Sequence, residues 1–216
     1  MAGGRSRAPF AFARARWQLA ADKESDEALV ERAGRGERRA ASVLVARHTD
    51  KIYAVCFRML RSRPAAEDAA QETFLRLWKN ASKWRPKGAK FETWLYRVAM
   101  NICLDQLRKA KREAPEESAP ELADDAPRQD DIVFAAERRL AVDDALAALP
   151  DRQRAAISLC HYQELSNIEA AEIMGVSVDA LESLLARGRR ALRDRLAPMR
   201  EILTGRMSDD ETVRQH

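Results

Sequence analysis

Hydrophobic residues recur every three or four positions through most of this chain, a spacing typical of amphipathic helices. The alternation of apolar and polar residues that marks strands is scarce, and the 216 residues include only 8 Gly and 8 Pro. The pattern predicts helices over residues 25–34, 37–61, 64–80 and 91–112. Ser25 begins the first helix as an N-cap, because two acidic residues follow it. We therefore predict an all-α fold.

The helical pattern is interrupted once by a strongly acidic segment. Residues 113–131 hold eight Asp and Glu against one Arg, a local charge of −7, with three Pro and few apolar residues. This composition is typical of a flexible linker. It separates a first small helical domain, 25–112, from a second, 132–203. We expect a basic, disordered extension at 1–24 and a polar tail at 204–216.

The second domain contains the pattern of a helix-turn-helix. After a helix that begins at Asp151, Ser166 and Glu169 have the spacing of a capping box. Gly175 suits a left-handed helix end, and Ser177 can cap the longer helix that follows. Such a pair of helices fits the major groove of DNA, although a helical hairpin with a solvated charged face remains the alternative. Arginines that can neutralise phosphates there are Arg187, Arg189, Arg190, Arg193 and Arg195.

Two surfaces of the first domain are candidates for binding. Between residues 84 and 112, aromatic side chains are interleaved with Lys and Arg, which suits single-stranded DNA. Phe91 and Trp94 could instead be core, whereas Trp84 lies in a loop rich in Pro, Gly and Lys. The helix over 64–80 carries an acidic face, which is either solvated surface or a docking site for a basic protein. That face consists of Glu67, Asp68, Gln71 and Glu72 beside Leu75. The other side of the same helix is apolar and predicted to face the core, with Ala70, Phe74, Leu77 and Trp78.

Composition argues against catalysis. The three cysteines, Cys56, Cys103 and Cys160, form no CxxC pair and lie in apolar helical runs, so we expect reduced, packed thiols. The 3 His lack ligand spacing, and no phosphate-binding loop or nucleophile motif is present. We predict no active site, no metal and no cofactor. The sequence contains no uninterrupted run of about 18 apolar residues, so we predict no membrane span. We expect a cytoplasmic protein. The net charge of +4 alone proves nothing about nucleic acid.

At this point the chain resembles a known family, the extracytoplasmic-function (group IV) sigma factors of bacterial RNA polymerase. Residues 66–78, AEDAAQETFLRLW, resemble their polymerase-docking helix. Residues 91–105, FETWLYRVAMNICLD, resemble their promoter-melting and minus-ten-recognition helix. Leu149-Pro150, Leu165-Ser166, Glu169-Ala170-Ala171 and Gly175-Val176-Ser177 are similar to their minus-thirty-five domain. The resemblance covers about residues 25–200 in the family's order.

The resemblance implies a non-enzymatic subunit that directs core RNA polymerase to promoters. Its partners would be the clamp and flap regions of polymerase, promoter DNA as duplex and as melted non-template strand, and an anti-sigma factor. Contacts to polymerase would come from Asp68, Gln71, Glu72 and Leu75. Contacts to the minus-ten element would come from Trp84, Arg85, Lys90, Phe91, Trp94, Arg97, Asn101, Arg108, Lys109 and Arg112. Contacts to the minus-thirty-five element would come from Ser177, Asp179, Ala180, Glu182, Ser183, Arg187, Arg189 and Arg190.

The segment over residues 179–183 departs from the family. Its recognition helix commonly reads Gly-Thr-Val, a basic residue and Ser, whereas this chain has Asp-Ala-Leu-Glu-Ser at 179–183. A carboxylate at Glu182 cannot hold a phosphate but can accept a hydrogen bond from a cytosine amine, so we expect an unusual minus-thirty-five preference. Two other classes of function remain open. They are a helix-turn-helix regulator that works without polymerase, and a helical adaptor that binds only proteins.

Overall fold

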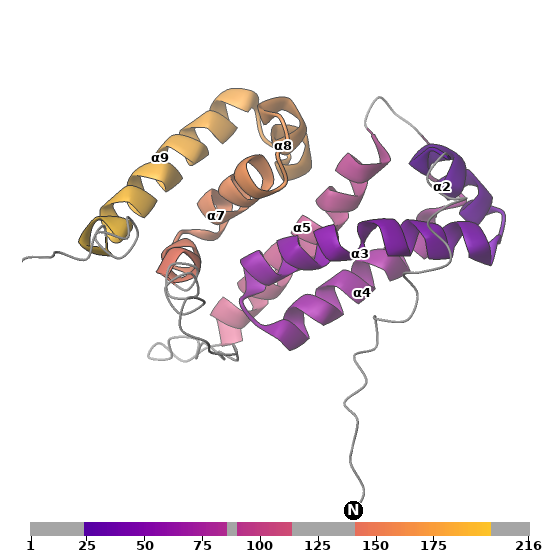
Figure 1. The fold of residues 1–216 in the computed structure, drawn as a ribbon, viewed down its shortest axis with the longest axis horizontal. Coiled ribbons are helices and arrows are strands. Elements are labelled where there is room, and N and C mark those ends of the chain that lie inside the picture. Colours follow the sequence, from indigo (N-terminus) through magenta and orange to yellow (C-terminus); the bar gives the residue numbers. More distant parts are fainter. Residues whose placement is uncertain (1–23, 86–89, 114–140, 200–216) are drawn as a thin grey trace, which may run out of the picture.

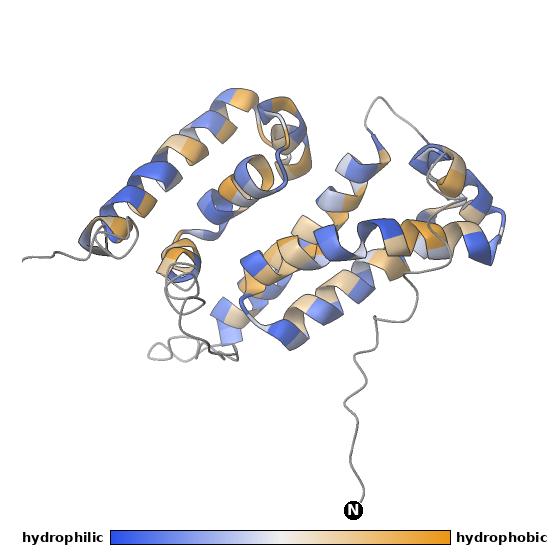
Figure 2. Ribbon diagram, in the orientation of Figure 1, coloured by the Kyte–Doolittle hydropathy of each residue, from blue (hydrophilic) through white to orange (hydrophobic). Residues whose placement is uncertain are grey.

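The computed structural model describes residues 24–85, 90–113 and 141–199, and all regular structure in these ranges is helical (Figure 1). The same ranges contain no strand, so the predicted all-α fold is confirmed. The expected basic extension, nearly all of the acidic linker and the polar tail lie outside the described residues. In Figure 2 the helices carry both hydrophilic and hydrophobic residues, as the periodicity predicted.

In the described part of the first domain, α3 runs through the middle and packs against the other helices. The helices are α2 (Asp26–Gly34), α3 (Arg38–Leu60), α4 (Arg63–Asn80) and α5 (Phe91–Glu113). Ser25 caps α2 and Ser62 caps α4, each by accepting a hydrogen bond from the backbone amide three residues later, at 3.3 and 3.4 Å. The bounds agree with the sequence pattern to within a residue or two at each end.

A partly buried polar contact ties α2 to α3 and to the start of α5. The Asp26 carboxylate pairs with Arg47 and lies 2.8 Å from Nε2 of His48. Burial alone would raise the pKa of Asp26, but these two neighbours lower it below its ordinary value, so the carboxylate stays ionised at neutral pH. The His48 ring lies edge-on to Phe91, with centroids 5.5 Å apart. The first residue of α5 is therefore fixed in the core.

The second domain is held together by the apolar face of its longest helix, α9, which packs on α7 and α8. Its described helices cover residues 141–147, α7 (Asp151–Ile157), α8 (Asn167–Met174) and α9 (Val178–Leu196). Leu181 and Leu185 of α9 are buried between them, as the periodicity predicted. The sequence did not predict the π-helical turn Ser158–Tyr162 that extends α7.

The two domains lie against each other, with α8 packed on α5 (Figure 1). A second contact is made at the end of α3, which stops at Arg61 in a left-handed conformation, with φ of 56°. There the Met59 carbonyl accepts a hydrogen bond of 2.9 Å from Nη1 of Arg154 on α7. None of the helices in the described ranges is long and apolar enough to cross a membrane.

The end of α2 touches the backbone that leads to Trp84, and this contact predicts a sensitive glycine. A Cβ at Gly34 would lie 2.8 Å from backbone atoms of both Ala81 and Ser82. We expect Gly34→Ala to lower the free energy of unfolding by about 1–3 kcal/mol, measured by urea denaturation, because backbone must move. Arg35→Ala is the control, since its exposed ion pair with Glu31 should contribute less than about 0.5 kcal/mol. A Gly34→Ala variant as stable as the parent would contradict the close approach.

Candidate functional site

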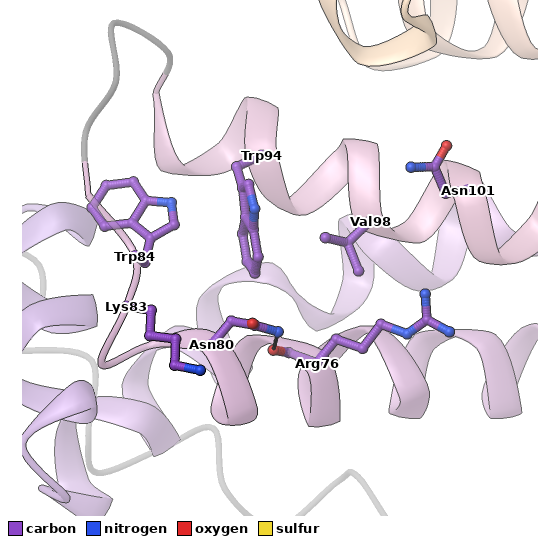
Figure 3. Close-up of a pocket in the computed structure, with 7 residues that line it drawn as sticks. All are labelled: Arg76, Asn80, Lys83, Trp84, Trp94, Val98 and Asn101. Atoms are coloured by element: carbon purple, nitrogen blue, oxygen red, sulfur yellow. Dashed lines mark hydrogen bonds between the residues drawn. The ribbon is translucent and has the colours of Figure 1, made fainter.

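A cavity of about 350 Å³ lies between the end of α4 and the neighbouring face of α5 (Figure 3). Its lining combines aromatic rings with basic and amide side chains, namely Arg76, Asn80, Lys83, Trp84, Trp94, Val98 and Asn101. Figure 3 shows the two tryptophan rings toward one end, and Arg76 and Asn101 toward the other. Stacking surfaces beside cations and hydrogen-bonding amides are the groups that recognise an unstacked nucleotide.

The turn after α4 holds Trp84 at this cavity. The Trp84 amide donates a hydrogen bond of 2.8 Å to the carbonyl of Asn80. The Arg85 guanidinium then donates to the carbonyls of Ser82 and Trp84, at 3.0 and 2.7 Å. Arg85 therefore closes the turn, a role that the sequence pattern did not reveal. Trp84 itself is only partly buried, as its loop position predicted.

Phe91 does not lie where a base could stack on it. Its side chain is completely buried, with 0% exposed. Its ring packs edge-on to Trp84, with centroids 5.8 Å apart, and lies 6.0 Å from the ring of Trp94. Phe91 is therefore part of the core, the alternative that the sequence left open, because His48 and the two tryptophans surround the ring. Phe91 instead supports Trp84 and Trp94, which are both partly buried.

Three further minus-ten candidates lie just before α5 or on it, on the side that faces the second domain. Lys90 Nζ lies 3.0 Å from Glu169 Oε1, and this hydrogen bond raises the pKa of Lys90. Arg97 Nη2 lies 2.8 Å from Glu172 Oε1. Asn101 is exposed and lines both the first cavity and a second one of about 420 Å³, which Arg97 and the turn after α8 also line.

The last minus-ten candidates follow the exposed end of α5, away from the cavity. Arg108 pairs with Asp105 of its own helix, and Lys109 Nζ lies 3.9 Å from Glu113 Oε1. Arg112 is also exposed, with its Nε 3.4 Å from the carbonyl of Arg108. Exposed pairs within one helix hold their partners weakly, so these cations remain available to a phosphate backbone.

The predicted docking face of α4 is exposed at Asp68, Gln71 and Leu75. Glu72 is partly buried and accepts a hydrogen bond of 2.8 Å from Arg76, which lowers the pKa of Glu72. Because Arg76 also lines the first cavity, one ion pair links the docking face to the aromatic pocket. The pattern predicted that Trp78 would face the core, but 51% of its side chain is exposed, one turn from Leu75 at 54%. The spacing of these two residues was the signal for an apolar pair on this face.

The helix-turn-helix has the caps that the sequence predicted. The Ser166 hydroxyl accepts from the Glu169 amide at 3.3 Å, and the Ser166 amide donates to the Glu169 carboxylate at 3.1 Å. Gly175 ends α8 with φ of 62°, and the Ser177 hydroxyl caps α9. All the predicted minus-thirty-five residues are exposed on α9 or at its cap, namely Ser177, Asp179, Ala180, Glu182, Ser183, Arg187, Arg189 and Arg190.

Glu182 is oriented by a neighbour that the sequence did not reveal. Its Oε1 accepts a hydrogen bond of 3.2 Å from Nδ2 of Asn167, the first residue of α8. The side-chain Oδ1 of Asn167 lies 3.8 Å from the Cys160 thiol, which donates to it. These two contacts fix the direction of the Asn167 amide and so present an ordered carboxylate at the surface of α9. Sequence separation hides this contact, because residues 167 and 182 lie on different helices.

The thiols and acids of the described residues form no metal site. Cys56 and Cys103 are buried and free, as expected, whereas Cys160 is only partly buried. No group of three or more His, Cys, Asp or Glu within the described ranges is placed to hold a metal ion.

Comparison with known proteins matches this arrangement. The family model for sigma-70 region 2 matches residues 44–113, and the model for sigma-70 region 4 matches residues 139–192. The chain is 35% identical over 172 residues to the ECF RNA polymerase sigma factor SigW of Bacillus subtilis, covering 75% of this chain and 91% of the relative. It is 31% identical over 191 residues to the ECF RNA polymerase sigma-E factor of Haemophilus influenzae, covering 83% and 99%.

Solved structures agree. CnrH in complex with the cytosolic domain of CnrY has a TM-score of 0.62 and 27% identity, over 81% of this chain and 99% of that one. RpoE of Bartonella quintana, in complex with the anti-sigma factor NepR, shares the fold, with a TM-score of 0.56 and 23% identity over 71% and 94%. A region 2 domain followed by a region 4 domain defines a sigma factor. This chain belongs to the extracytoplasmic-function RNA polymerase sigma factors, as its motifs predicted.

The cap of the recognition helix gives a prediction about stability. The Ser177 hydroxyl accepts from the Ala180 amide at 3.2 Å, so Ser177→Ala should cost about 1 kcal/mol of unfolding free energy. Ser177→Asp should keep the stability, because Asp caps equally well and suits the positive end of the helix. Ser183→Ala, an exposed change in the middle of α9, is the control and should be neutral or slightly stabilising. Equal stability of Ser177→Ala and the parent would show that the cap contributes nothing.

Proposed function

We propose that this sigma factor divides promoter recognition between its two domains and acts in the cytoplasm without catalysing a reaction. The first domain, residues 25–112, docks on the polymerase clamp through α4 and opens the minus-ten element. The second, residues 132–203, reads the minus-thirty-five element with α9 and contacts the polymerase flap. The observation that carries this proposal is the cavity between α4 and α5, in which two tryptophans meet two cations and two amides.

The cavity supplies what the melting step requires. Unstacking a base costs a few kcal/mol per step, and stacking on an aromatic side chain returns about 1–3 kcal/mol per base. Trp84 and Trp94 alone therefore roughly balance the cost for one or two flipped bases. The cations of the lining, Arg76 and Lys83, tip this balance by holding the backbone of the separated strand. Asn80 and Asn101 add hydrogen-bonding groups for a base edge.

The docking face suits a basic partner with a hydrophobic centre. Asp68 and Glu72 give this side of α4 negative charge, which would repel DNA and attract basic helices. Leu75 and Trp78 supply exposed apolar surface beside these acids, and large aromatic side chains commonly dominate binding energy in interfaces. We assign this face to the polymerase clamp and add Trp78 to the residues predicted from sequence.

An anti-sigma factor is the further partner that we propose. One solved structure described above is the sigma factor RpoE with the anti-sigma factor NepR, and the other is CnrH with the cytosolic domain of CnrY. This chain shares their fold along most of its described length. An inhibitor that bound here would have to cover α4, α5 or both, because these helices carry the surfaces for polymerase and for the melted strand.

Trp78 lies on the docking face of α4, whereas Trp84, in the turn after α4, lines the cavity. Substitution of one should therefore impair polymerase binding, and substitution of the other should impair promoter melting. Trp78→Ala should weaken binding to core polymerase about tenfold or more, a loss that excess sigma factor overcomes in transcription. Trp84→Ala should bind core normally but form open complexes on duplex promoters about 5- to 150-fold less well, even at saturation. Trp84→Phe should restore much of the activity, because Phe also stacks.

The measurements are core-binding titration and transcription in vitro on a genomic promoter pool. A template with a pre-melted minus-ten region should largely rescue Trp84→Ala, since the melting step is then bypassed. Normal transcription by Trp84→Ala on duplex templates would refute the assignment of the cavity. Equal promoter binding with and without core polymerase would instead favour a polymerase-independent helix-turn-helix regulator.

The ordered carboxylate on α9 predicts an altered minus-thirty-five preference. Glu182→Arg should change the ranking of bases at one position of a randomised promoter library, by about 1–3 kcal/mol between the best and the worst base. Asn167→Ala should weaken the same preference without reversing it, because Glu182 loses its donor. Arg187→Ala is the control and should lower binding to all sequences alike, as a phosphate contact would. Unchanged ranking in Glu182→Arg would contradict base reading by this residue.

A further inference from the structure

Two cations of the surface assigned to the melted strand, Lys90 just before α5 and Arg97 on it, are paired with acidic side chains of the second domain. Lys90 pairs with Glu169 at 3.0 Å, and Arg97 pairs with Glu172 at 2.8 Å. Both acids belong to α8, the first helix of the helix-turn-helix. A carboxylate at these distances takes the place that a phosphate oxygen would take on the same two cations.

The same polarity holds for the other ion pairs between the domains. Lys111 of α5 pairs with Asp151 at 2.6 Å, and Arg61 at the end of α3 lies 3.2 and 3.1 Å from Asp143 and Asp144. In each of these five ion pairs between the domains, the cation comes from the first domain and the acid from the second. The contact is therefore an electrostatic match between two opposite surfaces.

Less exposed contacts reinforce this match. The Tyr96 hydroxyl, on a side chain with 1% exposure, donates to Gln163 Oε1 at 2.7 Å. The Arg58 guanidinium lies over the ring of Tyr162, 4.1 Å from its centroid. Arg154 of α7 is buried and reaches the α3 carbonyl of Met59 at 2.9 Å. Salt screens such contacts less than the exposed pairs, so they give the arrangement its specificity.

The described arrangement cannot be the one that reads a promoter. The minus-thirty-five and minus-ten elements are by definition about 25 base pairs apart, which is roughly 85 Å at 3.4 Å per base pair. Here α8 of one reading domain is in hydrogen-bond contact with α5 of the other. The domains must separate before both elements can be bound at once.

We propose that the second domain is an internal competitor of promoter DNA, with Glu169 and Glu172 holding the free chain in a closed form until polymerase and promoter displace them. This proposal depends on the assignment of α5 to the melted strand made above. Only open chains can bind DNA through α5, so the apparent association constant is the intrinsic one multiplied by the fraction of chains that is open. The device requires no other protein, and it keeps the unbound sigma factor from occupying DNA unproductively.

Charge exchange at Arg97 and Glu172 tests the closed form in the full chain. Glu172→Arg and Arg97→Glu should each expand the chain at low salt, measured as the radius of gyration by X-ray scattering. The double variant Arg97→Glu/Glu172→Arg should be compact again, because the pair is restored with reversed signs. Asp194→Arg, which makes the same charge change on the exposed side of α9, is the control and should stay compact. Expansion of the double variant equal to that of the single variants would overturn the proposal.

Binding of a single-stranded minus-ten oligonucleotide supplies the functional readout. If nine-tenths of the parent chains are closed, Glu172→Gln should bind the strand up to about tenfold more tightly, without any added positive charge. If the variants expand but do not bind the oligonucleotide more tightly, the surface around Lys90 and Arg97 does not bind DNA, and the second domain does not compete with DNA for it. If Trp84→Ala also leaves the affinity for the oligonucleotide unchanged, the proposed minus-ten surface itself is wrong. If Trp84→Ala weakens binding of the oligonucleotide but no charge variant changes the radius of gyration, the minus-ten surface stands and the closed form is wrong.

Discussion

The C-terminal end of α3 imposes a constraint on which the arrangement of both domains depends. The last carbonyls of a helix have no partners within it. Arg61, the left-handed residue that follows α3, donates its backbone amide to the carbonyl of Phe57. The carbonyl of Met59 is satisfied from the other domain, by Arg154 at 2.9 Å. Burial lowers the pKa of Arg154, but Asp151 lies 2.7 Å away and balances its charge. Because Asp151 also pairs with Lys111, this one cluster joins α3, α5 and α7.

In the first domain, a short series of side-chain contacts leads from a polar pair to the nucleotide cavity. Asp26 stays charged between Arg47 and His48, and His48 lies against the ring of Phe91. Phe91 in turn fills the space beneath Trp84 and Trp94. A polar contact between α2 and α3 is thus connected, through His48 and Phe91, to the two stacking rings. This explains why the motif over residues 91–105 begins with a fully buried side chain.

Local sequence patterns were sufficient for the helices and their caps. Ser25, Ser166, Gly175 and Ser177 act within three or four residues of themselves, so spacing alone identified them. The pattern did not predict that Trp78 is exposed, and it left open whether Phe91 is core, because periodicity gives the direction of a helix face and not its depth. Depth depends on which side chains other helices bring, as His48 does for Phe91. The contact between Asn167 and Glu182 and the pairs between α5 and α8 join residues of different helices, which no local pattern reveals.

The closed arrangement also changes how salt should be understood in this protein. Binding of DNA releases counterions, so added salt weakens it by an amount that grows with the number of phosphates neutralised. Here Arg97 and Lys90 are already neutralised by Glu172 and Glu169, so their exchange for phosphates releases few additional ions. Salt also weakens the internal pairs that compete with DNA. The two effects oppose each other, and the salt dependence of promoter binding by the free chain should be shallower than its exposed cations alone would give.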